Sequence, residues 1–511
     1  MPKHVAFPIL LILLALGGCA VNPVTGEREL SLLSQTAVQK GIEQYRPAQQ
    51  MQGGEWVVDP QLTRYVSNLG QKIGASSGVP LPYEFVILNA SSPNAWALPG
   101  GKIAINRGLL MMLENEAELA AVLAHEVVHA AAGHGAQRMR RDMITQGLLV
   151  AAGAGLQIAG VGDGNQVVGI ARDAAYVLGL RYSRDAEREA DFYGTGYLAK
   201  AGYDPLAAVS LQEEFVKLSQ GRQQQAPWLT SHPPSRERVQ NNRVRAQQLL
   251  GEGYTQGRLG RESYQSATRI LRESADAYDL YDDAAKLYGE NETDAALQLV
   301  TQALNDFNAE PNFHALRGAI RMRQGRVDDA ITNFDRAIAR NSGYFAYPLM
   351  RGRALRARGD LNRARADLQQ SVRLLPTSDA YLALGGIAED TGDTDRAKIY
   401  YEQAAQSGGG SAAQQASIRY VALDIAQQPG RYVQVQVRPG EGYVDIVVRN
   451  RVNVDLANVL VQVEVDNQRR SLNVASLPGS SERGQRLALS NVTPASLGQA
   501  YAVKAEVAAA Q

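Results

Sequence analysis

The sequence predicts a multidomain protein with three parts: a mainly α-helical domain with a small edge β-sheet, an α-helical repeat solenoid, and a small β-sandwich-like module. Three observations lead to this prediction. They are a helical H-E-x-x-H segment near residue 125, a repeat of 34 residues that begins after residue 263, and period-two alternation from about residue 430. A chain of 511 residues is also too long for one ordinary core. The expected bounds of the parts are 19–262, 263–425 and 430–511, after a targeting segment at 1–18.

The targeting segment has the pattern of a lipoprotein signal peptide. A basic start precedes an apolar run that is too short for a comfortable transmembrane span, and the run ends at Leu16-Gly17-Gly18-Cys19. This ending resembles a bacterial lipobox, in which the cysteine is acylated; the alternative is an ordinary signal peptide with a stray cysteine. Ala20 after the cysteine implies, by the sorting rule for such lipoproteins, a lipid anchor in the outer membrane on the periplasmic face. Cys19 is the only cysteine, so no disulfide can form within the chain.

One predicted helix in the first domain carries three of the six histidines. His125 and His129 are four residues apart, so they lie one turn apart on the same face of an α-helix. With Glu126 beside the first, this is the H-E-x-x-H pattern of two imidazole ligands for zinc and a carboxylate that can take a proton from water. Asn115 and Glu118 resemble a capping box at the start of this helix. The alternative is a structural helix that matches the pattern by chance.

A catalytic zinc ion needs a third protein ligand, and an acidic segment downstream offers one. Glu187 and Asp191 lie four residues apart on a second predicted helix. This spacing suits Glu187 as a ligand and Asp191 as the partner that orients a histidine. Taken alone, the same residues would fit a solvated acidic helix face.

Two further segments of this domain have recognisable patterns. Residues 94–110 alternate around Pro99-Gly100-Gly101 as an edge hairpin would. Such an edge beside the histidine helix either holds a substrate peptide as an added strand or has no ligand role. Residues 147–180 are rich in small and apolar side chains, and we expect loose helical packing or a mobile lid there. Membrane contact is a weaker alternative, because each half of the segment is too short to span a bilayer.

The second part is a tandem repeat. Four segments align with starts 34, 34 and 33 residues apart, and an alanine recurs in register at 296, 330, 364 and 397. Small residues let paired helices approach closely, which is typical of tetratricopeptide repeats. A stack of such helix pairs presents a concave face for extended peptides or partner proteins. The third part alternates in period two between PGEG and PGSSERG turns, which predicts a small β-module.

The motifs of the first domain resemble peptidase family M48, zinc metallopeptidases related to the CAAX prenyl protease and to HtpX. The resemblance rests on HEVVH, the following GH, E-x-E-A-D about sixty residues later, and a final H-P-P-x-x-x-R, and it covers residues 19 to about 250. The lipobox and the repeats look most like the periplasmic BepA-type members, and the β-module is an addition to that architecture. The resemblance implies a zincin-like protease domain of the gluzincin (HExxH) type.

The resemblance also implies residue roles. One Zn²⁺ per chain would be held by His125, His129 and Glu187, with Glu126 as the general base and Asp191 at the family's acidic position. The loop SHPPSRER would place His232 and Arg238 near the metal, where either can stabilise the oxyanion of peptide attack. A neutral His232 could instead cap the open zinc position and hold the enzyme off, or could be only a histidine at a helix start.

Two classes of function follow. The first is a zinc-dependent endopeptidase, tethered in the bacterial cell envelope by its lipid anchor, that degrades misfolded or stalled envelope and outer-membrane proteins. The second is a chaperone or assembly scaffold whose repeats contact the outer-membrane assembly machinery and whose metal site is quiescent. A membrane-embedded prenyl-peptide protease is disfavoured because the multiple spans are missing. Nucleic acid is not an expected partner, since 52 basic residues balance 52 acidic ones.

Overall fold

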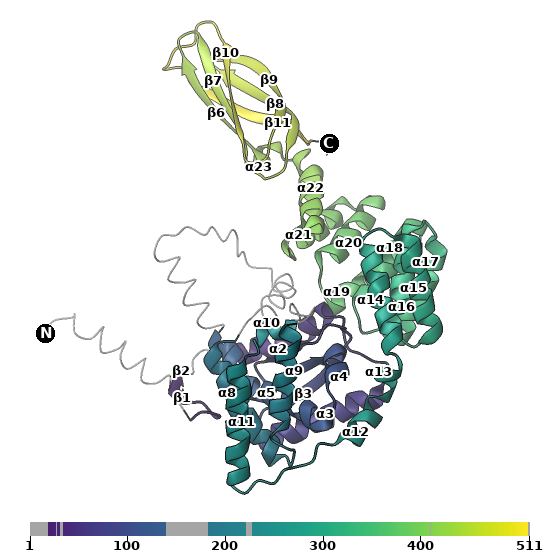
Figure 1. Cartoon of the computed structure of the whole chain (residues 1–511). Helices are drawn as coiled ribbons and strands as arrows, with labels where there is room; N and C mark the ends of the chain where they lie inside the picture. The colour runs from purple at the N-terminus through teal and green to yellow at the C-terminus, as the bar shows by residue number, and fades with distance from the viewer. Residues whose placement is uncertain are drawn as a thin grey trace, which may run out of the picture. The chain divides into compact units, whose positions relative to one another are not determined.

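The computed structural model describes residues 19–26, 28–30, 34–138, 182–220, 227–408 and 410–508 (Figure 1). The predicted signal peptide at 1–18 and the segment at 147–180 fall outside these residues. The described chain divides into two compact units, of which one ends at Arg358 and the other begins at Gly359. The division therefore falls inside the helical repeats.

The first unit contains a small mixed sheet with strand order β3-β5-β4. β3 (Glu84–Leu88) runs parallel to β5 (Lys102–Asn106), and β4 (Ala95–Leu98) runs antiparallel to β5 and is an edge of this sheet. The hairpin predicted around Pro99-Gly100-Gly101 is confirmed by the β4–β5 pairing. The predicted strand ends early, however, at Asn106: its side-chain Nδ2 donates to the Ser92 carbonyl, and the chain continues as α4 (Arg107–Met112).

Helices surround this sheet. A separate pair of short antiparallel strands, β1 (Cys19–Val21) and β2 (Arg28–Leu30), precedes them. The helices before the repeats are α2 (Ser34–Met51), α3 (Pro60–Ser76), α5 (Glu116–Ala131), α8 (Arg184–Lys200), α9 (Ala207–Ser219), α10 (Pro227–Ser231) and α11 (Arg236–Gly251).

α5 is the central helix of this region, and every one of its residues is buried. It packs against α3, α8 and α9 and against β4 and β5 (Figure 1). The Asn115 side chain accepts a hydrogen bond from the Glu118 amide at 3.0 Å, so the predicted N-cap is present. The Glu118 carboxylate accepts a hydrogen bond from the backbone amide of Glu114, and not from that of Asn115 as in a capping box. Gly133, at a φ of 70°, follows the helix in the left-handed conformation that commonly ends one.

The first repeats belong to the same unit. Their helices are α12 (Arg261–Ala267), α13 (Arg269–Glu273), α14 (Ala275–Gly289), α15 (Thr293–Asp306), α16 (Pro311–Arg323), α17 (Val327–Arg340) and α18 (Ala346–Arg358). α16 and α17 approach closely at Gly318, where a Cβ atom would lie 2.6 Å from the Phe334 ring. A larger residue than glycine at position 318 would therefore disturb the packing of these two helices.

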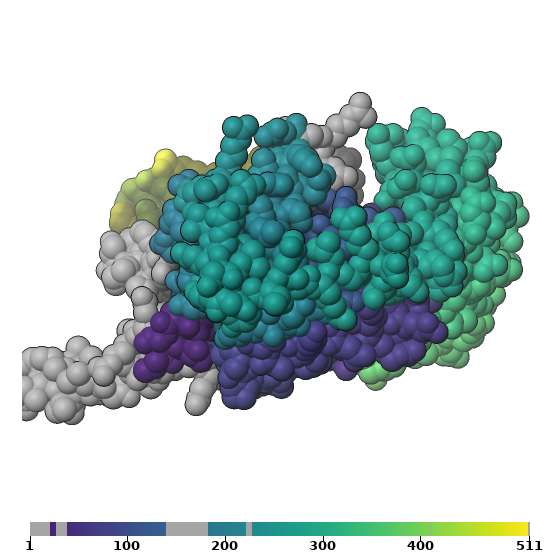
Figure 2. Space-filling model, turned by 60° about the horizontal axis from the view of Figure 1, so that its bottom comes forward, coloured from purple at the N-terminus to yellow at the C-terminus, as the bar shows by residue number. Residues whose placement is uncertain are grey.

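One hydrophobic core continues from α3 and α5 into α14, α15 and α16. Buried polar contacts add to it. The Tyr278 hydroxyl accepts a hydrogen bond from Trp56 Nε1 at 2.7 Å and donates to Glu310 Oε2 at 2.6 Å, and the Asn89 amide donates to Glu310 Oε1 at 2.8 Å. α12 also packs against α3, and in the space-filling view the teal surface adjoins the indigo surface of earlier residues (Figure 2). The first repeats are thus a fixed part of the first unit.

The second unit holds the remaining repeats and the β-module. Its helices are α19 (Leu361–Leu374), α20 (Ser378–Asp390), α21 (Thr394–Gln406), α22 (Ser411–Ile425) and α23 (Pro429–Tyr432). Its strands are β6 (Val433–Gly440), β7 (Tyr443–Asn450), β8 (Leu456–Val465), β9 (Gln468–Leu477), β10 (Glu482–Ala488) and β11 (Gly498–Val507). They form two three-stranded antiparallel sheets, β10-β7-β6 and β11-β8-β9, around one apolar core. The small β-module predicted from period-two alternation is confirmed.

No helix in the described part of the chain is both long enough and apolar enough to cross a bilayer.

Candidate metal centre

α5 presents two histidines from the centre of the first unit. His125 and His129 lie one turn apart, and their Nε2 atoms are 3.1 Å from each other. Their exposed fractions are 6% and 2%. Glu126, on the same turn, is fully buried, and neither of its carboxylate oxygens has a hydrogen-bond partner. A buried carboxylate without a partner is costly, so its retention here points to a functional demand.

α8 brings the acidic residues to these histidines. The helix starts at Ser183, whose side chain accepts a hydrogen bond from the Ala186 amide. It crosses α5 at Gly194, where a Cβ atom would lie 3.2 Å from the backbone nitrogen of His125. This close approach places Glu187 and Asp191, which lie seven and three residues before the glycine, against the two histidines.

The loop between α10 and α11 supplies the third histidine. His232 is 1% exposed, and its Nδ1 lies 2.9 Å from Glu187 Oε1 and 3.2 Å from His125 Nε2. Its Nε2 lies 3.5 Å from Glu126 Oε1. The family resemblance implies that His232 lies near the metal but leaves its role open. In the structure Nδ1 of His232 lies beside the ligand atoms of His125 and Glu187.

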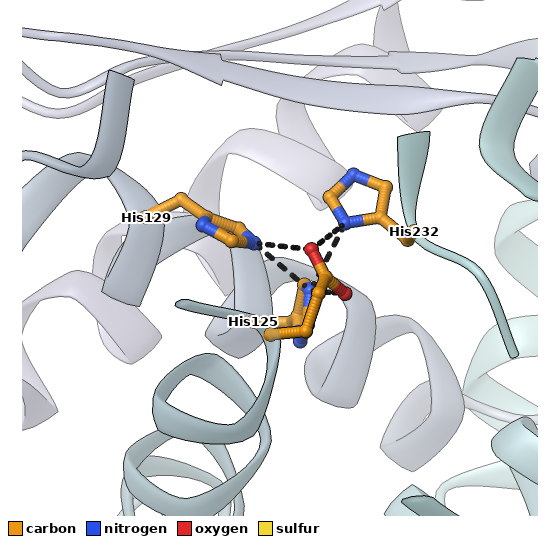
Figure 3. Close-up of side chains that lie close together, drawn as sticks. His125, His129 and His232 are labelled. Atoms are coloured by element: carbon orange, nitrogen blue, oxygen red, sulfur yellow. Dashed lines mark hydrogen bonds and ion pairs between the residues drawn. The ribbon is translucent and has the colours of Figure 1, made fainter. Parts of the chain in front are cut away.

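Four ligand atoms converge at this point, one each from His125, His129, His232 and Glu187, and all lie within 4.8 Å of one another (Figure 3). Neighbouring pairs are separated by 2.9, 3.1, 3.2 and 3.5 Å. A tetrahedral zinc site with bonds of 2.0–2.1 Å requires ligand atoms about 3.3 Å apart. The donor set therefore fits a metal ion, and the three histidines and one glutamate form a candidate metal site.

The carboxylates of Glu187 and Asp191 stabilise positive charge at this point, either a proton on His125 or a bound cation. Burial by itself lowers the pKa of His125, but hydrogen bonds to Asp191 and Glu187 outweigh it and raise that pKa to about 9. Burial raises the pKa of Glu187, whereas His232 and the hydrogen bonds from the surrounding imidazoles hold it well below its usual value. Burial also lowers the pKa of His129, which keeps that imidazole neutral as a metal ligand must be.

Each α5 histidine is oriented by a partner on its other nitrogen. His125 Nδ1 lies 3.1 Å from Asp191 Oδ1, as the spacing predicts. His129 Nδ1 lies 2.8 Å from Nδ1 of His134, whose Nε2 lies 3.2 Å from Glu189 Oε2. The residue spacing that selects the ligands predicts neither the His134 contact nor the Glu189 contact. The GH that follows the motif is the signal that could have identified the first of these contacts.

Arg238 lies beside the candidate metal site, as the family resemblance implies. Its guanidinium donates to both oxygens of Asp191 at 2.7 Å and lies 2.9 Å from Glu187 Oε2, and the side chain is 5% exposed. Because carboxylates engage these donors, the geometry favours a positioning role for Arg238 over direct stabilisation of an oxyanion.

Two aromatic residues complete the site, and neither is predicted by the sequence. Trp228 stacks on His232 with ring centroids 4.2 Å apart, and Tyr182 stacks on His129 at 3.7 Å. The Tyr182 hydroxyl donates to the Ala97 carbonyl on the edge strand β4 at 3.1 Å. The metal site and the sheet edge are therefore in direct contact through one side chain.

Comparison with known proteins agrees with this geometry. The model of Peptidase family M48 matches residues 60–246. Over 185 residues the chain is 33% identical to metalloprotease YcaL of Escherichia coli, a match that covers 36% of this chain and 68% of that protein. The chain belongs to peptidase family M48. The family predicted from the sequence is thus confirmed. The tetratricopeptide repeats are confirmed as well, because their family model matches residues 281–345 and 349–412.

Other relatives in family M48 are longer than the matched region. The beta-barrel assembly-enhancing protease of Escherichia coli is 27% identical over 218 residues, which is 39% of this chain and 44% of that protein. The mitochondrial metalloendopeptidase OMA1 of Schizosaccharomyces pombe is 34% identical over 179 residues, which is 35% of this chain and 51% of that protein. The chain thus spans about half the length of these two relatives.

Proposed function

We propose that this M48 protein is a zinc-dependent endopeptidase of the bacterial cell envelope. The observation that carries the proposal is Glu126, a fully buried carboxylate with no hydrogen-bond partner, which lies between two histidines of a metal site. A purely structural metal site has no need of such a group. A bound zinc ion would polarise a peptide carbonyl and lower the pKa of a water molecule.

The chain's own residues would then carry out the remaining steps. Glu126 would take the proton from the attacking water and deliver it to the leaving amine. His125, His129 and Glu187 would hold the metal, while Asp191 and Arg238 would keep His125 and Glu187 in place. His232 would move away from the ligand atoms to donate to the developing oxyanion.

The edge strand β4 supports a way of binding the substrate. Within the described residues β4 pairs only with β5 and packs against α5, so an extended peptide could pair with its other side as a fourth strand close to the metal site. The Tyr182 hydroxyl donates a hydrogen bond to the Ala97 carbonyl, and a substrate strand that pairs there would have to replace this hydrogen bond.

The proposal also includes where the protein is located and which polypeptides it cleaves. Acylation of Cys19 would tether the protein to the outer membrane on its periplasmic face, where misfolded or stalled envelope proteins are the polypeptides within reach. The similarity to the beta-barrel assembly-enhancing protease of Escherichia coli supports this setting. Mass spectrometry of the mature N-terminus tests the tether: acylation is expected in the wild type and absent from Cys19→Ser.

A second candidate is a chaperone or assembly scaffold that acts through its repeats with a quiescent metal site. It is favoured by His232, because a fourth protein ligand closes the position that catalysis needs open. The repeats would then contact the outer-membrane assembly machinery.

Casein cleavage by purified Glu126→Gln tests the proposal. We expect full zinc content and an unchanged melting temperature with cleavage reduced to background, while Glu114→Gln, an exposed residue just before α5, cleaves as the wild type does. Unchanged cleavage by Glu126→Gln would remove the protease proposal. If that variant restores envelope integrity in a deletion strain, the scaffold function dominates.

A further inference from the structure

The edge strand β4 has a row of backbone groups on the side that faces away from β5. In the antiparallel ladder Ala95 lies opposite Ile105. The next pair is hydrogen-bonded, because the Asn106 amide donates to the Asn94 carbonyl at 2.8 Å. Hydrogen-bonded and non-hydrogen-bonded pairs alternate along such a ladder, so the amides and carbonyls of Ala95 and Ala97 point away from β5. An added polypeptide strand would pair with these groups.

Two residues from other elements occupy carbonyls on this side of β4. The backbone amide of Trp228, near the start of α10, donates to the Pro93 carbonyl at 3.3 Å. The Tyr182 hydroxyl, from the residue before the N-cap of α8, donates to the Ala97 carbonyl at 3.1 Å. Between them the amide and the carbonyl of Ala95 have no hydrogen-bond partner within the described residues. A polypeptide strand would therefore find unpaired groups at Ala95 and an occupied carbonyl at Ala97.

The Tyr182 contact is the more easily replaced of the two. The Trp228 amide belongs to the first turn of a helix, where it has no partner inside the helix, so the Pro93 carbonyl satisfies it. The Tyr182 hydroxyl lies at the end of a rotatable, half-buried side chain and can leave without a movement of the backbone. Its O–H···O distance of 3.1 Å also exceeds the usual value of about 2.7–2.8 Å. A backbone amide of a substrate could take its place.

The same side chain contacts the candidate metal site. The Tyr182 ring stacks on His129 with centroids 3.7 Å apart and an interplanar angle of 15°, and its centroid lies 5.4 Å from that of His232. A ring stacked in this way covers one face of the His129 imidazole. Tyr182 therefore joins the two places that a polypeptide has to reach, the edge of β4 and the histidines.

We propose that Tyr182 sets the affinity of the protein for polypeptide substrates: its hydroxyl takes the hydrogen bond at the Ala97 carbonyl that a backbone amide of an extended substrate donates when it pairs with β4. Substrate and hydroxyl compete for one acceptor, so each binding event displaces Tyr182 from the edge. The side chains of the substrate do not change this competition, but a proline opposite Ala97 has no amide to donate. The proposal rests on the pairing at β4 that the proposed function includes, and it adds the residue that limits this pairing.

Fluorescence anisotropy of fluorescein-labelled casein with the full-length protein tests this proposal. Glu126→Gln protein is the parent, so that cleavage does not affect the titration. Tyr182→Phe in this parent removes the hydroxyl and keeps the ring that stacks on His129. We expect the dissociation constant for casein to fall about 2- to 10-fold, because the substrate no longer has to replace a hydrogen bond between uncharged groups.

Tyr45→Phe in the same parent is the matched control. The Tyr45 hydroxyl donates to the Ile103 carbonyl on β5 at 3.0 Å, so this change removes the same kind of hydrogen bond from the same sheet but not from the edge of β4. We expect the dissociation constant to stay within about twofold of that of the parent. Zinc content and the circular dichroism spectrum should be the same in all three proteins.

The same comparison without Glu126→Gln measures catalysis, and the KM for casein cleavage should fall in Tyr182→Phe by a similar factor. The proposal is overturned if the affinity of Tyr182→Phe for casein is unchanged or lower, if Tyr45→Phe raises the affinity equally, or if no protein binds casein. A lower kcat at an unchanged KM would also overturn it, because the hydroxyl would then act in the chemical step. A wild type that binds casein without cleaving it contradicts the proposed function alone, since the affinities come from the inactive parent.

Discussion

Replacement of Asp191 by asparagine tests how much the residues that orient the metal ligands contribute to zinc binding, without changing a ligand. In the structure Asp191 accepts two hydrogen bonds from Arg238 at 2.7 Å and lies 3.1 Å from Nδ1 of His125. Asp191→Asn keeps the shape of the side chain but removes its charge and one acceptor. His125 then has a neutral amide in place of the carboxylate that fixes its ring, and we expect zinc affinity to fall about 10- to 100-fold.

The same change disturbs a buried ion pair. Arg238 is 5% exposed and would keep only the Glu187 carboxylate, 2.9 Å away, as its charged partner. Breaking a buried pair costs about 3–5 kcal/mol, and the remaining carboxylate places this case at the low end of that range. Urea unfolding followed by tryptophan fluorescence reports on the first unit alone, because Trp56, Trp96 and Trp228 all lie within it.

Zinc affinity is measured by competition with a chelator, and Asp185→Asn on the same helix is the control. The Asp185 side chain is 83% exposed and pairs only with exposed Arg188, so its loss should change zinc affinity less than about twofold and stability by less than about 1 kcal/mol. Folded Asp191→Asn that binds zinc within twofold of the wild type would refute the orienting role.

Three further predictions concern the packing that surrounds the site. Gly194→Val should lower both zinc content and melting temperature, because the added atoms meet the α5 backbone at 3.2 Å; zinc content equal to that of the wild type would contradict this. Glu310→Gln should destabilise the first unit by about 1–3 kcal/mol in urea unfolding, since the Tyr278 hydroxyl loses a charged acceptor, and an unchanged midpoint would show that the contact is unimportant. Burial, together with nearby arginines, lowers the pKa of His314 to about 4 from 6.5, so the unfolded chain binds a proton that the fold does not. Stability should therefore fall by about 1–3 kcal/mol as the pH drops from 6.5 toward 4, and His314→Gln should reduce this slope; an equal slope in both proteins would contradict the assignment.

The sequence was sufficient for features that depend on local spacing. His125 and His129 share a face because α5 is regular, and the Asn115 cap follows from the residue type at a helix start. The helical repeats were predictable because the same pattern of residues recurs about every 34 residues along the chain. The acidic partners on α8 were found by spacing and family resemblance together.

Contacts that depend on tertiary approach were not predictable. Tyr182 stacks on His129, which lies 53 residues before it, and no periodicity connects these two residues. The engagement of Arg238 by two carboxylates depends on how α11 meets α8. The continuation of the first unit into the repeats depends on the buried Tyr278–Glu310 contact, which no local pattern announces.

Elemental analysis of the purified full-length protein beside Glu187→Ala tests the account most directly. We expect the ion to be bound by His125, His129 and the carboxylate of Glu187. The wild type should therefore carry one zinc per chain and Glu187→Ala almost none. Asp185→Ala is the control and should keep its zinc. A full equivalent of zinc in folded Glu187→Ala would contradict the central claim.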